Sequence, residues 1–443
     1  MDTKQTSKMR VLMQPWLAHG HISPYLELAK KLSTRNFTIY FCSTPINLTS
    51  IQKRITQEQS ISIKLVELHL PSSHDLPPHH HTTNALPPHL MPALLSAFEK
   101  SAPQFSTIIK TLNPDLVIHD FNQPWVPTTA AELNIPAMEF ITASAVMCSA
   151  SLHVHKKPEY PFPEMHLGNV SRLMIRGAQE REKDVSRILE CLERSSNVIL
   201  VKTFRDIEGK YIDYCSTLAG KKIVPVGPLV EKNLEEWTDQ DNEIAEWLDK
   251  KVESSSVFVS FGSEYFLTKE EIEEVAHGLE LSKVNFIWVL RFPVGEEVRI
   301  DEVLPKGFLE NVGEKGMVVE GWAPQVEILA HPSIGGFVSH CGWSSVMESM
   351  SFGIPIIALP MHLDQPMNAR LVEMVGVGVE VKRDENGELK RDEIGEVIRK
   401  VVVGKDGKDV RNKARNLKDM LRSKGDEEIC KVVEELLHLC RKG

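Results

Sequence analysis

Short apolar runs alternate with amphipathic stretches along the first half of the chain. Residues 10–14 (RVLMQ) and 37–43 (FTIYFCS) have the length and composition of strands, and residues 24–35 (PYLELAKKLSTR) between them have the spacing of a helix with one apolar face. Further strands are predicted at residues 63–70, 115–120, 135–141 and 222–230. Such alternation indicates a parallel sheet with crossover helices.

The alternation starts again after a polar, acidic stretch at residues 231–243, where we place a domain linker. A helix is predicted at residues 268–282, and residues 408–440 predict two packed helices. The sequence therefore predicts an α/β protein with two doubly wound, Rossmann-like domains that face a cleft. The strands of the second domain are predicted at residues 256–263, 285–292, 317–322, 335–340 and 354–360.

Composition narrows the class of protein. The net charge of -10, without any long block of lysine and arginine, argues against nucleic acid as a partner. The first twenty residues hold only a three-residue apolar run, Val11 to Met13, so neither a signal peptide nor a membrane span is predicted. Seven scattered cysteines without a CxxC pair suit a reducing compartment and give no zinc spacing. We expect a cytoplasmic protein.

A strand pattern runs directly into a helix pattern in residues 335–350 (GGFVSHCGWSSVMESM). Residues 340–343 therefore lie on a turn at a helix N-terminus. Ser345 and Glu348 have the spacing of a capping box, which alone explains both residues structurally.

The same turn has the chemistry of an anion site. A helix N-terminus offers unpaired N–H groups and a positive dipole end, and Gly342 lets a phosphate approach the backbone. His340 adds a further donor. A metal site lacks additional ligands at suitable spacing, and Cys341 has neither an obvious base nor a second cysteine nearby. The motif therefore favours a phosphate site.

The 44 residues from Trp322 to Gln365 closely resemble the signature box of plant UDP-dependent glycosyltransferases (family 1). The resemblance rests on the opening WAPQ, on His331, on HCGW with the following serine and glutamate, and on the closing DQ. Two positions depart from the family pattern: Ser344 replaces the usual asparagine, and Leu359 replaces a frequent tryptophan. Similarity outside the box includes HGHISP, FVSFGS and GLELSKVNFIWVLR.

Membership of this family implies the GT-B fold. Residues 1–235 would form the acceptor-binding Rossmann-like domain, and residues 245–420 would form the UDP-sugar-binding one. Residues 421–443 would form a C-terminal helix that packs back toward the N-terminal domain.

The resemblance also assigns residues to the donor. The box implies that an aromatic ring stacks on uracil, that polar side chains bind the ribose, and that the final glutamine favours glucose. Trp322 and Ala323 match the uracil positions, and Gln325 and Glu348 match the ribose positions. The diphosphate positions are matched by His340, Ser345 and, outside the box, Ser263; Gly342 belongs to the same turn, and the hydroxyl of Ser344 can donate to a phosphate in place of the usual asparagine. The sugar positions are matched by Trp343, Asp364, Gln365 and, more distantly, Thr142.

Sugar transfer requires a base for the acceptor hydroxyl, and a neutral imidazole suits this task. AHGHISP offers His19 and His21 before a helix whose expected N-cap and first residue are Ser23 and Pro24. The residues alone do not separate the two histidines, whereas the family pattern GHxxP selects His21. Asp120 matches the family's aspartate that orients the base; in isolation it reads equally well as the end of a strand.

Together these features predict an inverting, metal-independent hexosyltransferase without a cofactor, in which UDP-glucose is the donor and the chain acts as a monomer. Similarity to a subgroup of the family implies that the acceptor is a sugar on a triterpenoid or flavonoid glycoside. Alternatives are transfer to a flavonoid or terpenoid aglycone, and nucleotide-sugar binding without catalysis. A dehydrogenase is disfavoured because the first strand is not followed by G-x-G-x-x-G. The Pro/His-rich residues 69–90 are expected to form a mobile acceptor-side loop rather than a metal site.

Overall fold

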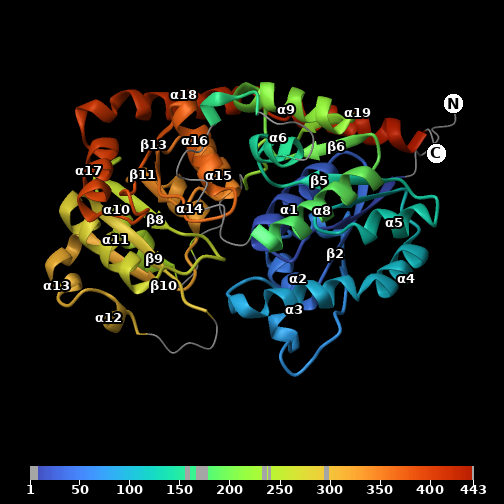
Figure 1. Ribbon diagram of the computed structural model, residues 1–443, viewed down its shortest axis with the longest axis horizontal. Coiled ribbons are helices and arrows are strands. Elements are labelled where there is room, and N and C mark those ends of the chain that lie inside the picture. Colours follow the sequence, from blue (N-terminus) through green and yellow to red (C-terminus); the bar gives the residue numbers. More distant parts are fainter. Residues whose placement is uncertain are drawn as a thin grey trace. The chain divides into compact units, whose positions relative to one another are not determined.

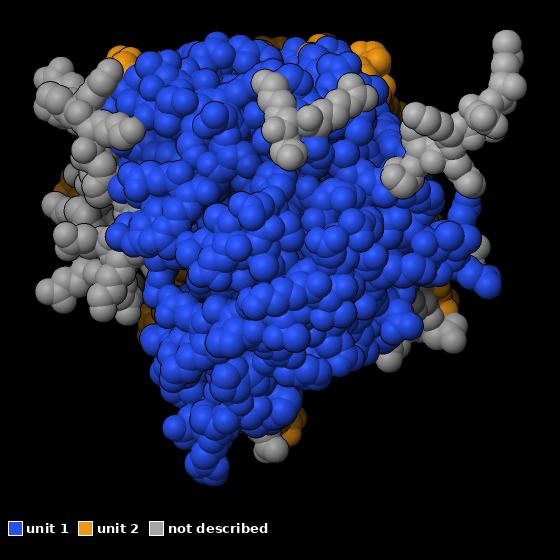
Figure 2. All heavy atoms as spheres, turned by 90° about the vertical axis from the view of Figure 1, so that its right-hand side faces the viewer, with its two compact units in different colours: residues 1–160, 177–229, 426–443 blue, residues 161–176, 230–425 orange. Residues whose placement is uncertain are grey.

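The computed structural model (Figure 1) describes residues 8–154, 160–165, 178–231, 237, 241–293 and 299–441. The chain divides into two compact units, coloured separately in Figure 2. Unit 1 comprises residues 1–160, 177–229 and 426–443, and unit 2 comprises residues 161–176 and 230–425. Most of the predicted linker, residues 231–243, lies outside the described residues.

Unit 1 contains a seven-stranded parallel sheet with the order β3-β2-β1-β4-β5-β6-β7. The order reverses between β1 and β4. This is the topological switch point, where α/β sheets bind ligands at the carboxyl ends of their strands. The strands are β1 (Met9–Gln14), β2 (Phe37–Ser43), β3 (Ile63–Glu67), β4 (Leu116–His119), β5 (Ala137–Ile141), β6 (Val198–Val201) and β7 (Lys222–Pro225).

Both faces of this sheet are buried under helices. Val11 and Met13 of β1 join one apolar cluster with Tyr25, whereas Leu12 joins another with Phe98. Because successive side chains of a strand point to opposite faces, near-continuous apolar runs fit a sheet that is covered twice. The helices of unit 1 are α1 (His19–Ser33), α2 (Pro45–Lys53), α3 (Met91–Glu99), α4 (Ala102–Leu112), α5 (Trp125–Ala131), α6 (Ala145–Val154), α8 (Ala178–Arg194), α9 (Arg205–Ala219) and α19 (Glu427–Arg441).

The C-terminal helix α19 belongs to unit 1. Asp426, directly before it, forms ion pairs with Lys31 (2.5 Å) and Arg35 (2.7 Å) near the end of α1. The apolar side chains of α19 complete the cluster that covers one face of the sheet. They are Ile429, Val432 and Leu436.

Unit 2 contains a six-stranded parallel sheet with the order β10-β9-β8-β11-β12-β13, so its switch point lies between β8 and β11. The strands are β8 (Ser256–Ser260), β9 (Asn285–Leu290), β10 (Gly316–Glu320), β11 (Ile334–Ser339), β12 (Ile356–Ala358) and β13 (Gly378–Glu380). The helices are α10 (Asn242–Asp249), α11 (Lys269–Ser282), α12 (Ile300–Val303), α13 (Phe308–Val312), α14 (Gln325–Ala330), α15 (Trp343–Phe352), α16 (Gln365–Val375), α17 (Arg391–Val402) and α18 (Lys408–Lys424).

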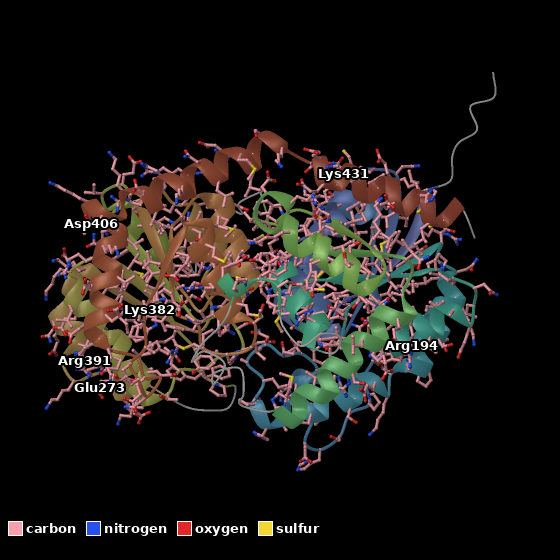
Figure 3. The ribbon with its side chains drawn as sticks, turned by 45° about the horizontal axis from the view of Figure 1, so that its top comes forward. Arg194, Glu273, Lys382, Arg391, Asp406 and Lys431 are labelled. Carbon is pink, nitrogen blue, oxygen red and sulfur yellow. The ribbon has the colours of Figure 1, made fainter. Side chains whose placement is uncertain are left out.

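Helix α11 begins where the sequence predicts a helix start, because Thr268 and Glu271 form a capping box. It packs against α17, and Arg391 of α17 forms an ion pair with Glu273 at 3.5 Å (Figure 3). Two features differ from the prediction. The short strands β6 and β13 were not predicted, and the two C-terminal helices α18 and α19 pack in different units. Of the helices that the structure describes, none is both long and apolar enough to cross a bilayer.

Candidate active site

Two side chains at the switch point of unit 1 face each other. His21 lies in the first turn of α1, which follows β1, and Asp120 follows the last residue of β4. The Nδ1 atom of His21 lies 2.8 Å from Oδ2 of Asp120. Asp120 is fully buried, whereas 19% of the His21 side chain is exposed. A buried carboxylate therefore holds an imidazole that reaches solvent.

The carboxylate of Asp120 is held by backbone donors as well. The N–H of Trp16 donates to Oδ2 (3.0 Å) and the N–H of Phe121 donates to Oδ1 (2.8 Å). Because Oδ2 accepts, Nδ1 of His21 carries the proton and the lone pair of the neutral ring is on Nε2. This tautomer is the one that a general base needs. Thr142 was assigned to the donor sugar, and its hydroxyl oxygen lies 3.1 Å from the same Nδ1.

Helix α1 begins at His19, five residues before the predicted start, so the assignment of Ser23 as N-cap and Pro24 as first residue is wrong. Pro24 lies inside the helix. The backbone of Trp16 and of Leu17 is bound by residues of other loops, and this turns the chain into the helix directly after β1. His21 is consequently held by helical backbone and not by a free loop.

Two buried titratable side chains lie near this pair, one at the end of β4 and one in the middle of β5. Nε2 of His119 lies 2.9 Å from Oγ of Ser195, and burial lowers the pKa of His119 to about 4. Glu139 pairs with His119 in the sheet register, and neither carboxyl oxygen has a hydrogen-bond partner among the described residues. Burial, reinforced by the charge of Asp120 and opposed by Lys221, raises the pKa of Glu139 to about 8.

Glu139→Gln is expected to reduce the pH dependence of stability. The folded-state pKa of Glu139 lies above the unfolded value, so its neutral form supports the fold below about pH 4.5, and this support is lost as the pH rises through about 8. Urea unfolding at pH 5 and pH 8 should show the variant losing roughly 1 to 3 kcal/mol less than the wild type. The exposed Glu132→Gln is the control. Parallel curves for Glu139→Gln and the wild type would contradict the assignment.

The predicted phosphate site lies at the switch point of unit 2. Residues 340–342, called the phosphate turn below, connect β11 to α15; Gly342 is the N-cap and Cys341 has a left-handed φ of 65°. The prediction of a capping box formed by Ser345 and Glu348 is wrong. The helix begins at Trp343 with Gly342 as its N-cap, so Ser345 lies inside it, and the hydroxyl of Ser345 accepts a hydrogen bond from Gln325 (3.1 Å).

The ring of His340 fits between two glycines. A Cβ atom on Gly262, which follows β8, would lie 2.6 Å from Nε2 of His340, and a Cβ on Gly342 would lie 2.5 Å from it. Both positions therefore require glycine because of close approach. Burial lowers the pKa of His340 to about 3, with a smaller effect from His362, so the ring is neutral at pH 7. It can donate to a phosphate but adds no positive charge.

The positions assigned to uridine surround the start of α14. Nε2 of Gln325 donates to Oε2 of Glu348 at 2.6 Å, which brings the two predicted ribose ligands together. The Trp322 side chain is exposed (54%), and Arg291 lies 5.2 Å from its ring centroid. A large exposed aromatic ring next to paired polar side chains is suited to stacking a base and binding a diol.

The positions assigned to the sugar lie at the start of α16. The side-chain oxygen of Gln365 accepts from the backbone N–H groups of Met361 (2.9 Å) and His362 (3.0 Å), so it holds the preceding turn. Asp364 is half-buried beside it. The other assigned residues are Ala323, buried before α14, Trp343 and Ser344, the first two residues of α15, and Ser263, half-buried after β8.

Two family models cover most of the chain. The model "Glycosyltransferase, N-terminal domain" matches residues 7–231, and "UDP-glucoronosyl and UDP-glucosyl transferase" matches residues 222–412. The chain belongs to the family 1 UDP-glycosyltransferases of plants. UDP-glucosyltransferase 29 of Panax ginseng is 54% identical over 99% of this glycosyltransferase and 98% of the relative.

Further comparisons give the fold and the subgroup. Beta-D-glucosyl crocetin beta-1,6-glucosyltransferase of Gardenia jasminoides is 53% identical, over 96% of this chain and 98% of the relative. The crystal structure of Glycyrrhiza uralensis UGT73P12, complexed with glycyrrhetinic acid 3-O-monoglucuronide, matches with a TM-score of 0.84 and 26% identity, over 98% of this chain and 96% of that one. The predicted GT-B fold with two Rossmann-like units is confirmed.

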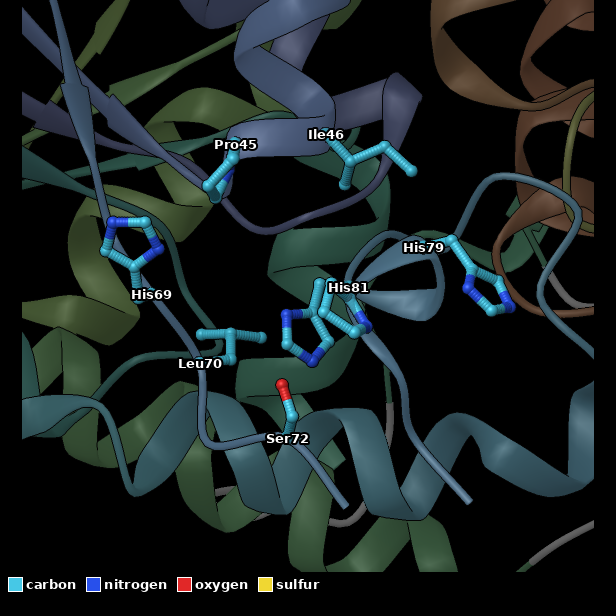
Figure 4. Close-up of a pocket in the computed structure, with 8 residues that line it drawn as sticks. Pro45, Ile46, His69, Leu70, Ser72, His79 and His81 are labelled. Carbon is cyan, nitrogen blue, oxygen red and sulfur yellow. The ribbon is translucent and has the colours of Figure 1, made fainter. Parts of the chain in front are cut away.

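Unit 1 of this glycosyltransferase also contains a cavity of about 380 Å³ at the carboxyl ends of β2 and β3. Pro45 and Ile46 of α2 line one side of it, and Leu70 and Ser72 line the opposite side (Figure 4). Its remaining lining residues are His69, Pro78, His79 and His81.

Hydrogen bonds hold part of the Pro/His-rich loop, which was expected to be mobile. The carbonyl of His81 accepts from the Thr44 hydroxyl (2.8 Å), and the N–H of Thr83 donates to the carbonyl of Leu17 (3.1 Å). The loop is thereby bound to the segment between β1 and α1. The loop that lines the cavity is therefore hydrogen-bonded to the segment that leads into the helix of His21.

Sequence reasoning missed several of these features. Gly262 was overlooked although it lies within the predicted strand at residues 256–263, and a glycine inside a strand pattern is itself a sign of close approach. The contact of Thr142 with His21 and the burial of Glu139 depend on tertiary packing and had no local signal.

Proposed function

We propose that the protein transfers glucose from UDP-glucose to a hydroxyl of a small plant glycoside, with inversion at the anomeric carbon. The observation that carries this proposal is the 2.8 Å contact between Nδ1 of His21 and the buried carboxylate of Asp120, which prepares a base for a hydroxyl acceptor. Supporting evidence comes from family membership.

The acceptor that we propose is a sugar hydroxyl of a triterpenoid or flavonoid glycoside, so that the enzyme extends or branches a sugar chain. The name of the Gardenia relative describes addition of glucose to a glucosylated molecule, and the Glycyrrhiza structure holds a monoglucuronide. Transfer to an aglycone is the alternative. The cavity of about 380 Å³ in unit 1 is the proposed acceptor site, because it lies at the same edge of the sheet as His21 and combines apolar walls with imidazole and hydroxyl groups.

In the proposed mechanism, Nε2 of His21 takes the proton of the acceptor hydroxyl as its oxygen attacks the anomeric carbon. The bond between that carbon and the diphosphate oxygen breaks, and UDP leaves. Asp120 stabilises the imidazolium that forms. The N–H groups at the start of α15 and the donor His340 bind the leaving diphosphate. No metal ion, cofactor or covalent intermediate takes part, and we propose that the enzyme acts as a monomer in the cytoplasm.

The test is product analysis by mass spectrometry after incubation with UDP-glucose and matched acceptor pairs. Each pair contains an aglycone and its own monoglucoside, from flavonoid and triterpenoid series. Gain of one hexose on the monoglucosides supports chain extension, whereas gain on the aglycones alone would replace this proposal with the alternative. A chelator should leave the rate unchanged; strong inhibition that added metal reverses would contradict the metal-free mechanism. The variant His21→Ala, which is expected to lose most of the transfer activity, serves as the negative control.

Ile46→Trp is expected to raise the acceptor KM by about tenfold or more and to leave the UDP-glucose KM unchanged. Ile46 is partly exposed on the cavity wall, so a larger indole fills space that the acceptor needs. Steady-state kinetics with each substrate varied in turn makes the comparison. Ile61→Trp, at a more exposed position away from the cavity lining, is the matched control. An unchanged acceptor KM would mean that the acceptor binds elsewhere.

A further inference from the structure

Asn368 connects two parts of the donor site of unit 2. It is the fourth residue of α16 and is completely buried. Its Nδ2 donates to the carbonyl of Cys341 at 3.0 Å and to Oδ2 of Asp364 at 2.8 Å. Cys341 lies in the phosphate turn, and Asp364 is assigned to the sugar hydroxyls. One amide group therefore joins the turn expected to bind the diphosphate to the carboxylate expected to bind the sugar.

The geometry of an amide makes this connection specific. The two hydrogens of an NH2 group point in fixed directions in one plane, so each acceptor receives one of them. A carboxylate at position 368 has the same shape but donates neither bond. A hydroxyl can donate only one. Asparagine is thus suited to hold a neutral carbonyl and a charged carboxylate at a fixed separation.

The phosphate turn needs such support because its backbone is strained. Cys341 has a φ of 65°, which residues other than glycine, asparagine and aspartate rarely adopt. Residues in this region persist only where the surrounding structure holds them. The N–H of Cys341 donates to Oγ of Ser339 (3.1 Å), and its carbonyl accepts from Asn368. The turn is therefore bound on both sides of the strained residue.

The orientation of Asp364 depends on the same amide. Asp364 precedes α16 as its N-cap residue, but its carboxylate makes no capping hydrogen bond. Its Oδ2 accepts instead from the side chain one turn later. A hydrogen bond to a charged group is stronger than one between neutral groups, so loss of this donor weakens the restraint on the orientation of the carboxylate.

We propose that Asn368 is a positioning residue for the donor, which sets the phosphate turn and Asp364 at the separation that a diphosphate-linked sugar requires. This inference rests on the proposed use of UDP-glucose. It predicts that Asn368 affects the diphosphate and sugar parts of the donor but not the uridine part, because its amide donates to the phosphate turn and to Asp364, whereas the ribose ligands Gln325 and Glu348 are bound to each other.

Asn368→Asp tests the proposal through calorimetric titration with uridine, UDP and UDP-glucose. We expect uridine affinity to be unchanged, UDP affinity to fall several-fold, and UDP-glucose affinity to fall by about tenfold or more, since a charge-assisted hydrogen bond is lost and two carboxylates repel. Asn285→Asp is the matched control: its Nδ2 also donates to a backbone carbonyl of unit 2, that of Ser255 at 3.4 Å. This control should alter none of the three affinities.

An equal loss of affinity for all three ligands would show a merely structural role and overturn the proposal, as would an unchanged affinity for UDP-glucose. Asn368→Ala, titrated in the same way, applies the same criterion should the aspartate variant not fold. The two proposals fail separately. If the wild type does not bind UDP-glucose, the proposed function fails; if it does and the variants show no graded loss, only the role of Asn368 fails.

Discussion

Replacement of His21 by alanine is expected to lower kcat/KM by about 10²- to 10⁴-fold, the contribution typical of a positioned general base. The reason is geometric. His21 is the residue whose Nδ1 lies 2.8 Å from the buried Asp120, so its Nε2 carries the lone pair that accepts the proton. The measurement is steady-state transfer from UDP-glucose, together with UDP binding. UDP affinity should be unchanged because the nucleotide positions all lie in unit 2.

His19→Ala is the matched control for this experiment. His19 lies in the same turn of α1, and the sequence alone did not separate the two histidines. The carboxylate of Asp120 accepts from His21 and from the backbone of Trp16 and Phe121. Near-normal turnover in His21→Ala, or an equal loss in His19→Ala, would rule out His21 as the base.

The strands that the sequence predicted share one property. Runs such as 37–43 are long, apolar and bounded by polar residues, and the structure forms β2 over the same residues. Strands β6 and β13 were missed although they are no shorter than β4, β7 and β12, which were predicted, so strand length does not explain the difference. In the sheets, β6 pairs with β5 and β7, and β13 pairs with β12.

Helix starts were predicted less well, for a physical reason. Capping rules describe what an isolated helix prefers, and they were satisfied at α11, where the Thr268–Glu271 box forms. At α1 and α15 the same rules failed, because the helices begin at His19 and Trp343, before the predicted caps. Both helices follow a strand at a switch point. The local rules therefore fail where the chain is arranged for binding, which is where strain and unusual starts are expected.

The candidate site was predictable only as two separate sets of residues. The strand-to-helix pattern gave the residues of the phosphate turn, whereas the His21–Asp120 pair came from the resemblance to the family. The sequence could not give their supporting contacts. Asn368 reaches back 27 positions to Cys341, and Thr142 contacts His21 across 121 positions. Such contacts depend on the order of strands in the sheet, which spacing along the chain does not encode.

Asp120→Asn is expected to lower kcat/KM by about 10²-fold or more, although the side chain keeps its shape. In the wild type, Oδ2 accepts from His21 and from the N–H of Trp16, while Oδ1 accepts from the N–H of Phe121. An amide places its NH2 group against at least one of these donors. If that group faces His21, the ring must accept at Nδ1 and carry its proton on Nε2, and the base is lost.

Asp115→Asn, at the other end of β4, is the matched control for this substitution. Asp115 also accepts from a backbone N–H, that of Arg10 at 2.7 Å, but it lies at the amino end of the strand, away from the switch point. Both variants should bind UDP as the wild type does. If Asp120→Asn retained wild-type turnover, or if Asp115→Asn lost as much, the carboxylate would not act by orienting His21. A loss of turnover in Asp120→Asn alone would show that the buried carboxylate acts by fixing the tautomer of His21.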